Sequence, residues 1–209
     1  MGWNLGTIKG RYTAVFLGFM ALVCALTVIG IQLWIKPALQ KAGEQNVTLL
    51  VSEIATDILD ELNGVQSQSR SITQLVAQLP SEQIDALLPG LIDQYGNAMV
   101  FGGGIWPLPD QREAGRAKFS TFYHRDAANA LIPNTYWNSA EAPNYFEQPW
   151  HKAGQQAPRG MCVWAAAYKD GASQQPRTNC AMGIYRDGAL YGVSTIDVTL
   201  GFFNELVAR

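Results

Sequence analysis

The hydrophobic pattern of the chain begins with one uninterrupted apolar segment. Residues 13–35 carry no charged side chain and are apolar on every helical face, which is rare for a buried helix of a soluble protein. At about 1.5 Å per residue they span roughly 34 Å, enough to cross a hydrocarbon core of about 30 Å. A signal peptide has a shorter apolar core and a small-residue cleavage site, which is not found after Ile35. We therefore predict a retained transmembrane helix at residues 13–35, after a short tail at residues 1–12.

The pattern then changes to a helical repeat. Apolar residues recur at steps of three and four from Val47 to Val65, which predicts one long helix over residues 36–79 that leads away from the membrane. A second helix is predicted to begin near Ser81. Pro89 lies inside it and is expected to kink or split it.

Beyond Gly96 the pattern is typical of strands. Alternating and β-prone residues predict strands at 98–101, 119–124, 162–170, 177–187 and 189–200. A short helix is expected within residues 143–154, and a last helix near Gly201. This order predicts an α+β lobe at residues 80–209 with one central antiparallel sheet.

Two cysteines lie at opposite ends of a predicted hairpin. If the hairpin is centred on Gly171, Cys162 falls directly opposite Cys180. Opposed Cα atoms lie about 4.5 or 5.5 Å apart, within the range of about 4.4–6.8 Å that a disulfide needs. Two unrelated thiols, or a reduced pair, are the alternative. A disulfide would indicate an oxidising compartment such as a bacterial periplasm. Cys24 is excluded as a partner because it lies within the predicted membrane helix.

Charge sets limits on partners and on orientation. The net charge is −2, 15% of residues are charged and there is no long basic run, so nucleic acid is not expected as a partner. Lys9 and Arg11 precede the apolar segment while Lys36 and Lys41 follow it, so the positive-inside rule gives a tie. The predicted disulfide therefore decides the orientation. The chain is expected in a bacterial inner membrane, with its N-terminus on the cytoplasmic side and residues 36–209 in the periplasm.

The sequence offers little support for catalysis or metal binding. The glycines at residues 102–104 invite comparison with the oxyanion loop of a membrane-anchored hydrolase, but there is no Gly-x-Ser-x-Gly motif. Close backbone packing explains glycines in a strand equally well. His124 and His151 are the only histidines, and their spacing from the cysteines does not match a zinc site. We expect no catalytic residue, metal or cofactor.

Six motifs together resemble a known family, the extracytoplasmic double-Cache domain of bacterial transmembrane receptors. They are FGGGIWP (101–107), FSTFYHRD (119–126), YFEQPWH (145–151), CVWAAAYKD (162–170), TNCAMGIY (178–185) and YGVSTIDV (191–198). The resemblance implies a PAS-like sheet that binds a small-molecule ligand and a long signal helix that forms a homodimer. It also implies a cytoplasmic output such as a diguanylate cyclase, with a chemoreceptor or a histidine kinase as alternatives.

The resemblance also implies that the chain is shorter than its relatives. A double-Cache module continues into a membrane-proximal lobe, a second membrane helix and an output domain. No diguanylate cyclase signature, HAMP-like helical pair or kinase motif is present in the sequence. We therefore expect the chain to be a fragment of a longer receptor.

The same resemblance suggests a ligand site. Amino-acid-binding members have an Arg two residues before a Trp-Tyr pair, then Tyr-x-Asp, then an Asp about 27 residues further on. Trp150, Tyr168, Asp170 and Asp197 match this pattern here. Two carboxylates would hold an ammonium group, whereas an Arg would hold a carboxylate.

The departures from this pattern change the expected ligand. Gln148 occupies the Arg position and His151 replaces the Tyr. Arg125 or Arg177 would have to supply the missing guanidinium, so a cation, an amine or a neutral polar solute fits better than a standard amino acid. His151 would add pH sensitivity. Alternatively, Tyr168 and Asp170 merely end a strand, Trp150 is a core aromatic, and the lobe is a dimerisation module with a degenerate pocket.

Overall fold

The computed structural model describes residues 8–168 and 176–201. Contacts divide the chain into two compact units, Met1–Ala55 and Thr56–Arg209. The first contains helix α1 (Ile8–Gly30), the π-helical segment η1 (Ile31–Ile35) and the first part of α2 (Lys36–Gln78). Among the described residues, the helical stretch beginning at Ile8 is long and apolar enough, by length and composition, to cross a membrane.

Polar groups inside the apolar stretch are satisfied locally. The Thr13 and Thr27 hydroxyls donate to the carbonyl oxygens of Lys9 and Val23, four residues earlier, at 3.0 and 2.8 Å. The π-helical segment η1 lies just before Pro37, which has no amide hydrogen to donate to the preceding turn. Such π-bulges are a common way to accommodate an interruption of the α-helical ladder.

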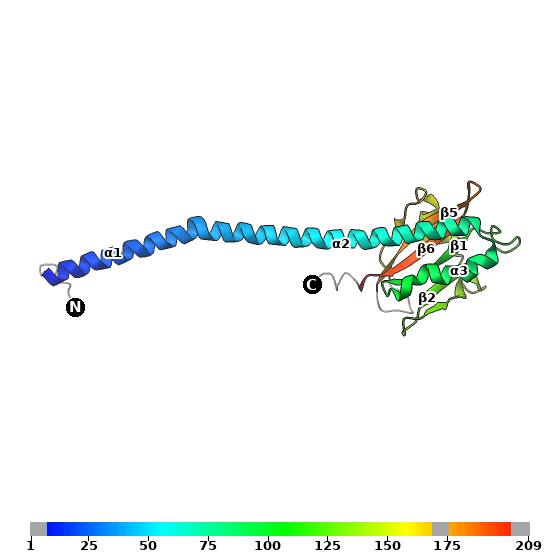
Figure 1. Ribbon diagram of the computed structural model, residues 1–209, viewed down its shortest axis with the longest axis horizontal. Coiled ribbons are helices and arrows are strands. Elements are labelled where there is room, and N and C mark those ends of the chain that lie inside the picture. The colour runs from blue at the N-terminus through cyan, green and yellow to red at the C-terminus, as the bar shows by residue number, and fades with distance from the viewer. Residues whose placement is uncertain (1–7, 169–175, 202–209) are drawn as a thin grey trace. The chain divides into compact units, whose positions relative to one another are not determined.

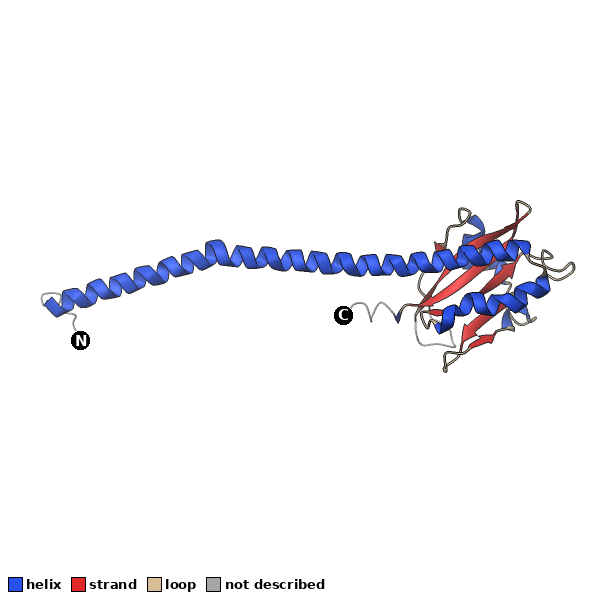
Figure 2. Cartoon of the chain, viewed as in Figure 1, coloured by secondary structure: helices blue, strands red, loops and turns tan. Residues whose placement is uncertain are grey.

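The second unit is built on one antiparallel sheet of six strands, ordered β3-β2-β1-β6-β5-β4 (Figure 2). The strands are β1 (Val100–Pro107), β2 (Thr121–Arg125), β3 (Leu131–Pro133), β4 (Val163–Trp164), β5 (Arg177–Arg186) and β6 (Ala189–Thr199). The α+β class and the central antiparallel sheet are as predicted. The long strands β5 and β6 match the predicted segments closely, whereas β3 was not predicted.

One face of the sheet is covered by the second half of α2 and by α3 (Ser81–Asp93), as Figure 1 shows. We call this the helix face. The core there combines apolar side chains of both helices with those of β1, β5 and β6: Val65, Ile72, Val76, Ile84, Leu88, Ile92, Val100, Ile105, Cys180, Met182, Ile184, Tyr191, Ile196 and Val198. Gln68 joins the two helices by donating to the Leu91 and Ile92 carbonyl oxygens at 2.9 and 3.2 Å.

Pro89 lies inside α3, which continues to Asp93, so of the two expected outcomes, a kink or a split, the split does not occur. Ile84 and Leu88 precede the proline, Ile92 follows it, and all three are buried on one face. Burial of each such side chain is worth about 1.5–3 kcal/mol, which offsets the roughly 3 kcal/mol that an interior proline costs. Packing on the sheet therefore overrides local preference.

The opposite face carries the irregular part of the chain. After β3 come the 3₁₀ turns η3 (Tyr136–Asn138) and η4 (Tyr145–Glu147) and the short helix α4 (Pro149–Gln156). The helix predicted within residues 143–154 is thus η4 followed by α4. A further 3₁₀ turn, η2 (Gln94–Gly96), follows α3. The helix expected near Gly201 lies outside the described residues apart from Gly201 itself.

The predicted disulfide between Cys162 and Cys180 is present, with Cα atoms 5.0 Å apart. The register used to predict it was wrong, because Cys180 lies opposite Trp164 and Cys162 precedes β4. Tyr168 pairs with Arg177, so residues 164–168 hold one residue more than residues 177–180. A strictly alternating strand over 162–170 is therefore not formed, and Asp170 at its end lies outside the described residues.

Candidate functional site

A cavity of about 650 Å³ opens on the sheet face opposite the helix face. Its described lining combines strand residues with residues of the loops and of α4 that cover this face. The lining residues are Trp106, Phe122, Asn134, Tyr136, Trp137, Pro149, Trp150, Ala165, Ala166, Tyr168, Asn179, Thr195 and Asp197. The volume is within the range of about 300–1,000 Å³ that is typical of small-molecule sites.

Strand alternation explains which residues reach the cavity. In β6, Thr195 and Asp197 line the cavity, whereas Ile196 and Val198 belong to the core on the helix face. In β5, Asn179 lines the cavity and its neighbour Cys180 belongs to that core. Successive residues of a strand point to opposite faces, so this sequence pattern by itself turns the polar side chains toward the cavity.

Trp106, at the end of β1, is the centre of an aromatic cluster. Its ring centroid lies 4.9 Å from that of Trp150, 5.1 Å from that of Phe122 and 5.8 Å from that of Trp137. The Trp106 Nε1–H donates to Thr195 Oγ1 at 2.8 Å, which satisfies the indole in this buried setting. The aromatic cluster is therefore held against the sheet by this hydrogen bond and lines one side of the cavity with aromatic rings.

Helix α4 brings Trp150 close to the sheet because of a glycine. A Cβ at Gly154 would lie 2.6 Å from a methyl carbon of Val193, a separation that real Cβ atoms do not show. Pro149 begins α4 at its first turn, where a proline is well tolerated. The lack of a side chain at residue 154 thus sets the depth at which α4 covers the cavity.

Of the seven predicted ligand-binding residues, three line the cavity, while Gln148, His151 and Arg125 do not. Trp150, Tyr168 and Asp197 line it. Gln148 precedes α4 and donates to the Asn144 carbonyl oxygen at 3.4 Å, outside the cavity lining. His151 lies in the core beneath α4, and Asp170 lies outside the described residues.

Arg125 lies on the opposite face of the sheet from the cavity. Its side chain is 3% exposed, and its Nη1 forms a 2.8 Å ion pair with Asp93 Oδ1. The guanidinium also donates to the carbonyl oxygens of Val100 at 2.8 Å, Asn129 at 3.0 Å and Asp93 at 2.7 Å. Phe122 reaches the cavity from the same strand, but Arg125 is an odd number of residues away and so faces the helices. Its expected part in binding a ligand carboxylate is not supported by this position.

His151 is fully buried and hydrogen-bonded on both ring nitrogens. Nε2 lies 2.9 Å from the Trp106 carbonyl oxygen, which can only accept, so Nε2 carries the hydrogen. Nδ1 lies 2.8 Å from Nε2 of Gln155 and accepts from that amide. Burial lowers the pKa of His151 below its usual 6.5, and the hydrogen bond to Trp106 opposes this only in part. The neutral imidazole therefore supports the backbone of Trp106.

This pKa shift predicts an acid-sensitive lobe. The unfolded chain binds the His151 proton near pH 6.5 while the folded state resists it, so stability should fall as pH decreases below about 6.5. The slope contributed by one histidine is at most about 1.4 kcal/mol per pH unit. Urea unfolding at pH 7.5, 6.5 and 5.5 measures this slope. His151→Asn is expected to reduce the dependence of the free energy of unfolding on pH. An NMR titration placing the His151 pKa at or above 6.5 would contradict the prediction.

Several cavity residues were missed by sequence reasoning. Trp106 and Phe122 were placed within quoted motifs but were given no role, although alternation along their strands was available as a signal. Alternation could have identified two more residues. Thr195 lies two residues before Asp197 in β6, and Asn179 lies opposite Asp197 in β5. Tyr136 and Trp137 lie in the 3₁₀ turn η3, which is too short to show a periodicity in the sequence.

The chemistry of the cavity favours a cation. Aromatic rings present electron-rich faces, and Asp197 adds a carboxylate. The lining residues include no Lys, Arg or His within the described part of the chain. In the same part of the chain, no group of three or more His, Cys, Asp or Glu side chains could hold a metal ion.

Comparison with known proteins assigns the lobe to a protein family. The family model of the methyl-accepting chemotaxis protein-like first PDC sensor domain matches residues 91–205, more than half of the chain. The chain belongs to this family. A PDC sensor domain is the ligand-sensing part of a receptor, so the lobe is a sensor domain rather than an enzyme. No curated protein matches the chain in sequence.

Solved structures share the fold of this PDC sensor domain. The extracellular domain of the putative histidine kinase soHK1S-Z6 has a TM-score of 0.66 at 19% identity, with 83% of this chain and 66% of that chain covered. "Methyl-accepting Chemotaxis protein X" has a TM-score of 0.65 at 14% identity, with 80% and 66% covered. The sensory domain of the Campylobacter jejuni chemoreceptor Tlp3 has a TM-score of 0.63 at 18% identity, with 83% and 67% covered. The chain thus spans about two thirds of the length of these structures.

Proposed function

We propose that this PDC sensor domain binds a small solute carrying an ammonium group in the cavity lined by Trp106, Trp150 and Asp197. The observation that carries the proposal is the composition of the lining, which joins aromatic faces to a carboxylate and includes no basic side chain among the described residues. A cation over an aromatic face gains about 0.5–2 kcal/mol, and the carboxylate adds an ionic hydrogen bond. A formed cavity of about 650 Å³ also favours ligand binding over a degenerate pocket.

The proposed ligand differs from that of a structural relative. Tlp3 of Campylobacter jejuni has been solved in complex with L-valine and with isoleucine, both of which carry a carboxylate. A ligand carboxylate needs a cationic partner when it is desolvated. Neither arginine considered for this role lines the cavity. Arg125 is held on the helix face by Asp93, and the buried Arg177 has its guanidinium over the Phe101 ring, with Cζ 3.2 Å from the ring centroid. We therefore infer that an amine without a carboxylate binds better here than an amino acid.

We further propose that residues 13–35 cross a bacterial inner membrane, with the N-terminus in the cytoplasm and residues 36–209 in the periplasm. The Cys162–Cys180 disulfide supports export, because such bonds persist in oxidising compartments. Dimerisation through α2 would carry the signal to a cytoplasmic output, such as a diguanylate cyclase or the signalling domain of a chemoreceptor or histidine kinase. Cysteine crosslinking along residues 47–58 in membranes tests the dimer.

The ligand proposal is tested with three matched compounds. Phenethylamine is L-phenylalanine without its carboxylate, and 2-phenylethanol is its neutral analogue. Binding to the detergent-solubilised chain can be followed by tryptophan fluorescence, since Trp106, Trp137 and Trp150 surround the cavity. We expect phenethylamine to bind at least tenfold more tightly than the other two, a difference of about 1.4 kcal/mol.

Asp197→Asn should remove most of this preference. Asp187→Asn is the control, because Asp187 is exposed in a turn with φ of 47°, a conformation that asparagine tolerates well. If L-phenylalanine binds as tightly as phenethylamine, or if Asp197→Asn keeps the amine preference, the cation site is wrong. The assignment as a sensor domain would stand in either case.

A further inference from the structure

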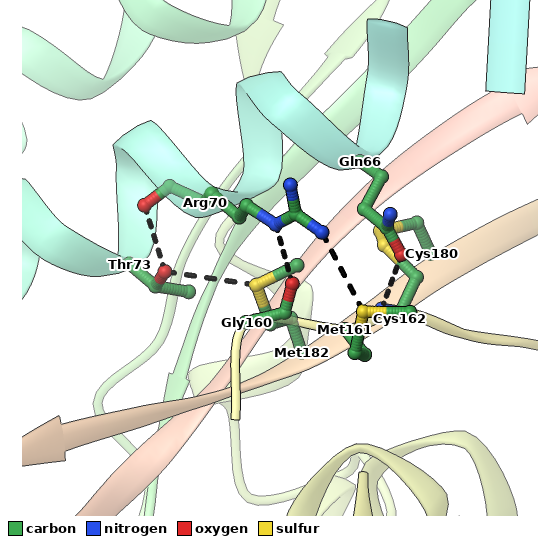
Figure 3. The surroundings of a disulfide bond; sticks show 8 residues. All are labelled: Gln66, Arg70, Thr73, Gly160, Met161, Cys162, Cys180 and Met182. Atoms are coloured by element: carbon green, nitrogen blue, oxygen red, sulfur yellow. Dashed lines mark hydrogen bonds between the residues drawn. A yellow bond between two sulfur atoms is a disulfide. The ribbon is translucent and has the colours of Figure 1, made fainter. Parts of the chain in front are cut away.

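Helix α2 holds the segment that precedes the cavity-lining residues of the β4 region. Arg70 Nε donates to the Gly160 carbonyl oxygen at 2.5 Å, and Arg70 Nη2 lies 3.5 Å from the Met161 sulfur. The Cys162 amide donates to Gln66 Oε1 at 3.0 Å. Figure 3 shows both side chains reaching from α2 to this segment, which we call the wall anchor (residues 160–162). Three interactions from two side chains of adjacent helical turns thus fix three consecutive residues.

The wall anchor leads directly into the cavity lining. After the two residues of β4 come Ala165 and Ala166, and then Tyr168, all of which line the cavity. Three residues from Cys162 to Ala165 span at most about 11 Å even when fully extended. A displacement of the wall anchor is therefore passed on to this part of the lining, which we call the cavity wall (residues 165–168).

The cavity wall is hydrogen-bonded to β5 at its two ends, Ala165 and Tyr168, and Tyr168 exchanges two backbone hydrogen bonds of 2.8 Å with Arg177. The preceding strand, β4, is only two residues long and lies at the edge. Ala165 is held by its amide, which donates to the Asn179 carbonyl oxygen at 3.0 Å, and by its carbonyl oxygen, which accepts from Thr178 Oγ1 at 2.7 Å. Such a segment opens more readily than the inner strands, so its position depends on what holds its ends.

The disulfide connects the wall anchor to the strand that carries a lining residue. Cys180 follows Asn179 in β5, with Asn179 in the cavity lining and Cys180 in the core on the helix face. Cys162 is thereby bonded covalently to β5 and hydrogen-bonded to α2 at the same residue. One point of the chain joins the sheet, the helix and the cavity wall.

We propose that Gln66 and Arg70, together with the Cys162–Cys180 disulfide, are positioning residues that set the place of the cavity wall from α2. The inference rests on the proposed ligand cavity and extends it to the helix that precedes the lobe. A ligand that favours one position of the wall then favours one arrangement of residues 66–70 against the wall anchor. By linkage, the factor by which the ligand shifts the equilibrium between two arrangements of α2 equals the factor by which that shift changes ligand affinity.

The first test measures the wall without any ligand. Amide hydrogen exchange of residues 163–168 is compared in the full chain for wild type, Gln66→Ala and Gln66→Glu. Loss of one hydrogen bond should speed exchange of this segment about fivefold in Gln66→Ala. Gln66→Glu keeps the acceptor oxygen and should restore the wild-type rate. Unchanged exchange in Gln66→Ala would overturn the proposal, whatever the ligand.

A matched control separates positioning from general loss of stability. Gln68 is two residues away on α2 but bonds α3, through the Leu91 and Ile92 carbonyl oxygens. Gln68→Ala should lower the melting temperature by an amount similar to Gln66→Ala while leaving exchange at residues 163–168 unchanged. Equal acceleration in both variants would reduce Gln66 to an ordinary stabilising residue and would overturn its positioning role.

The second test uses phenethylamine as the probe. Gln66→Ala, Arg70→Met and the double variant Cys162→Ser with Cys180→Ser should each weaken its binding about threefold or more, while Gln68→Ala should not. Changed exchange with no binding of phenethylamine to wild type would leave the positioning role intact and reject the proposed ligand class. Binding of phenethylamine with equal affinity to wild type and all three variants would reject the coupling of α2 to the cavity and keep the amine site.

Discussion

Replacing Gly104 by alanine is expected to destabilise the sensor lobe by about 3 kcal/mol or more. A Cβ at this residue would overlap the Thr121 carbonyl oxygen and would lie 2.9 Å from the Phe122 Cα. Both are backbone atoms of the neighbouring strand, which cannot move aside without breaking the pairing of Gly104 with Phe122. Because β1 is an inner strand, the whole sheet would have to adjust.

The measurement is urea unfolding followed by tryptophan fluorescence, supported by a thermal melt. For a lobe of about 150 residues, 3 kcal/mol corresponds to a decrease in melting temperature of about 6–12 °C. Gly64→Ala is the control, since an added Cβ there meets nothing within 4 Å and the residue is exposed on α2. That variant should gain about 0.5–1 kcal/mol from helix propensity. Equal effects of the two substitutions would show that close strand packing is not what requires glycine at residue 104.

Arg125→Met should cost about 3 kcal/mol, because it removes four hydrogen bonds from one buried guanidinium. The carbonyl oxygens of Val100 and Asn129 would lose their charged donor, and Asp93 would lose its ion-pair partner. Asp93 is 40% exposed, so water can replace part of what it loses, which keeps the cost below the upper end for a buried pair. The substitution should loosen the junction of α3 with β1 and with the β2–β3 turn.

The matched control is Arg116→Met. Arg116 pairs with Glu113 at 3.1 Å, but these side chains are 46% and 55% exposed. Exposed pairs of this kind contribute about 0–1 kcal/mol, so the loss should be small. The comparison also distinguishes two roles for Arg125. A structural residue changes the free energy of unfolding and leaves the preference for phenethylamine over L-phenylalanine unchanged, whereas a ligand-binding residue does the reverse.

Sequence periodicity was sufficient for most of the fold. The long helix, α3 and the pair β5–β6 were found because each buries one continuous face, and burial leaves a repeat of about 3.6 or 2 in the chain. β1 was cut short after Phe101, because three glycines carry no hydrophobic signal even though backbone pairing continues to Pro107. β3 has three residues at an edge and is too short to show alternation.

The site was harder to predict because a change of one residue in a strand reverses the direction of a side chain. Asp197 was selected because it matches the last Asp of the family pattern, and it does line the cavity. Charge alone made Arg125 a candidate, but its position in β2 places its side chain on the helix face. His151 and Trp150 are neighbours in α4, yet one lies in the core and the other lines the cavity. The loop residues Asn134 and Trp137 depend on tertiary packing that no local pattern encodes.

The edges of the sheet have a consequence for how copies of this lobe can associate. The outer strands β3 and β4 have only three and two residues, and β3 ends in Pro133, which has no amide hydrogen to donate. Long, unprotected edges recruit strands from other molecules and seed aggregates, and short or proline-terminated edges prevent this. The long strand β6 is enclosed by β1 and β5, and β4 pairs with β5 at Cys180 and Ala181. The outer strands of the sheet therefore offer a second copy of the lobe little backbone with which to pair.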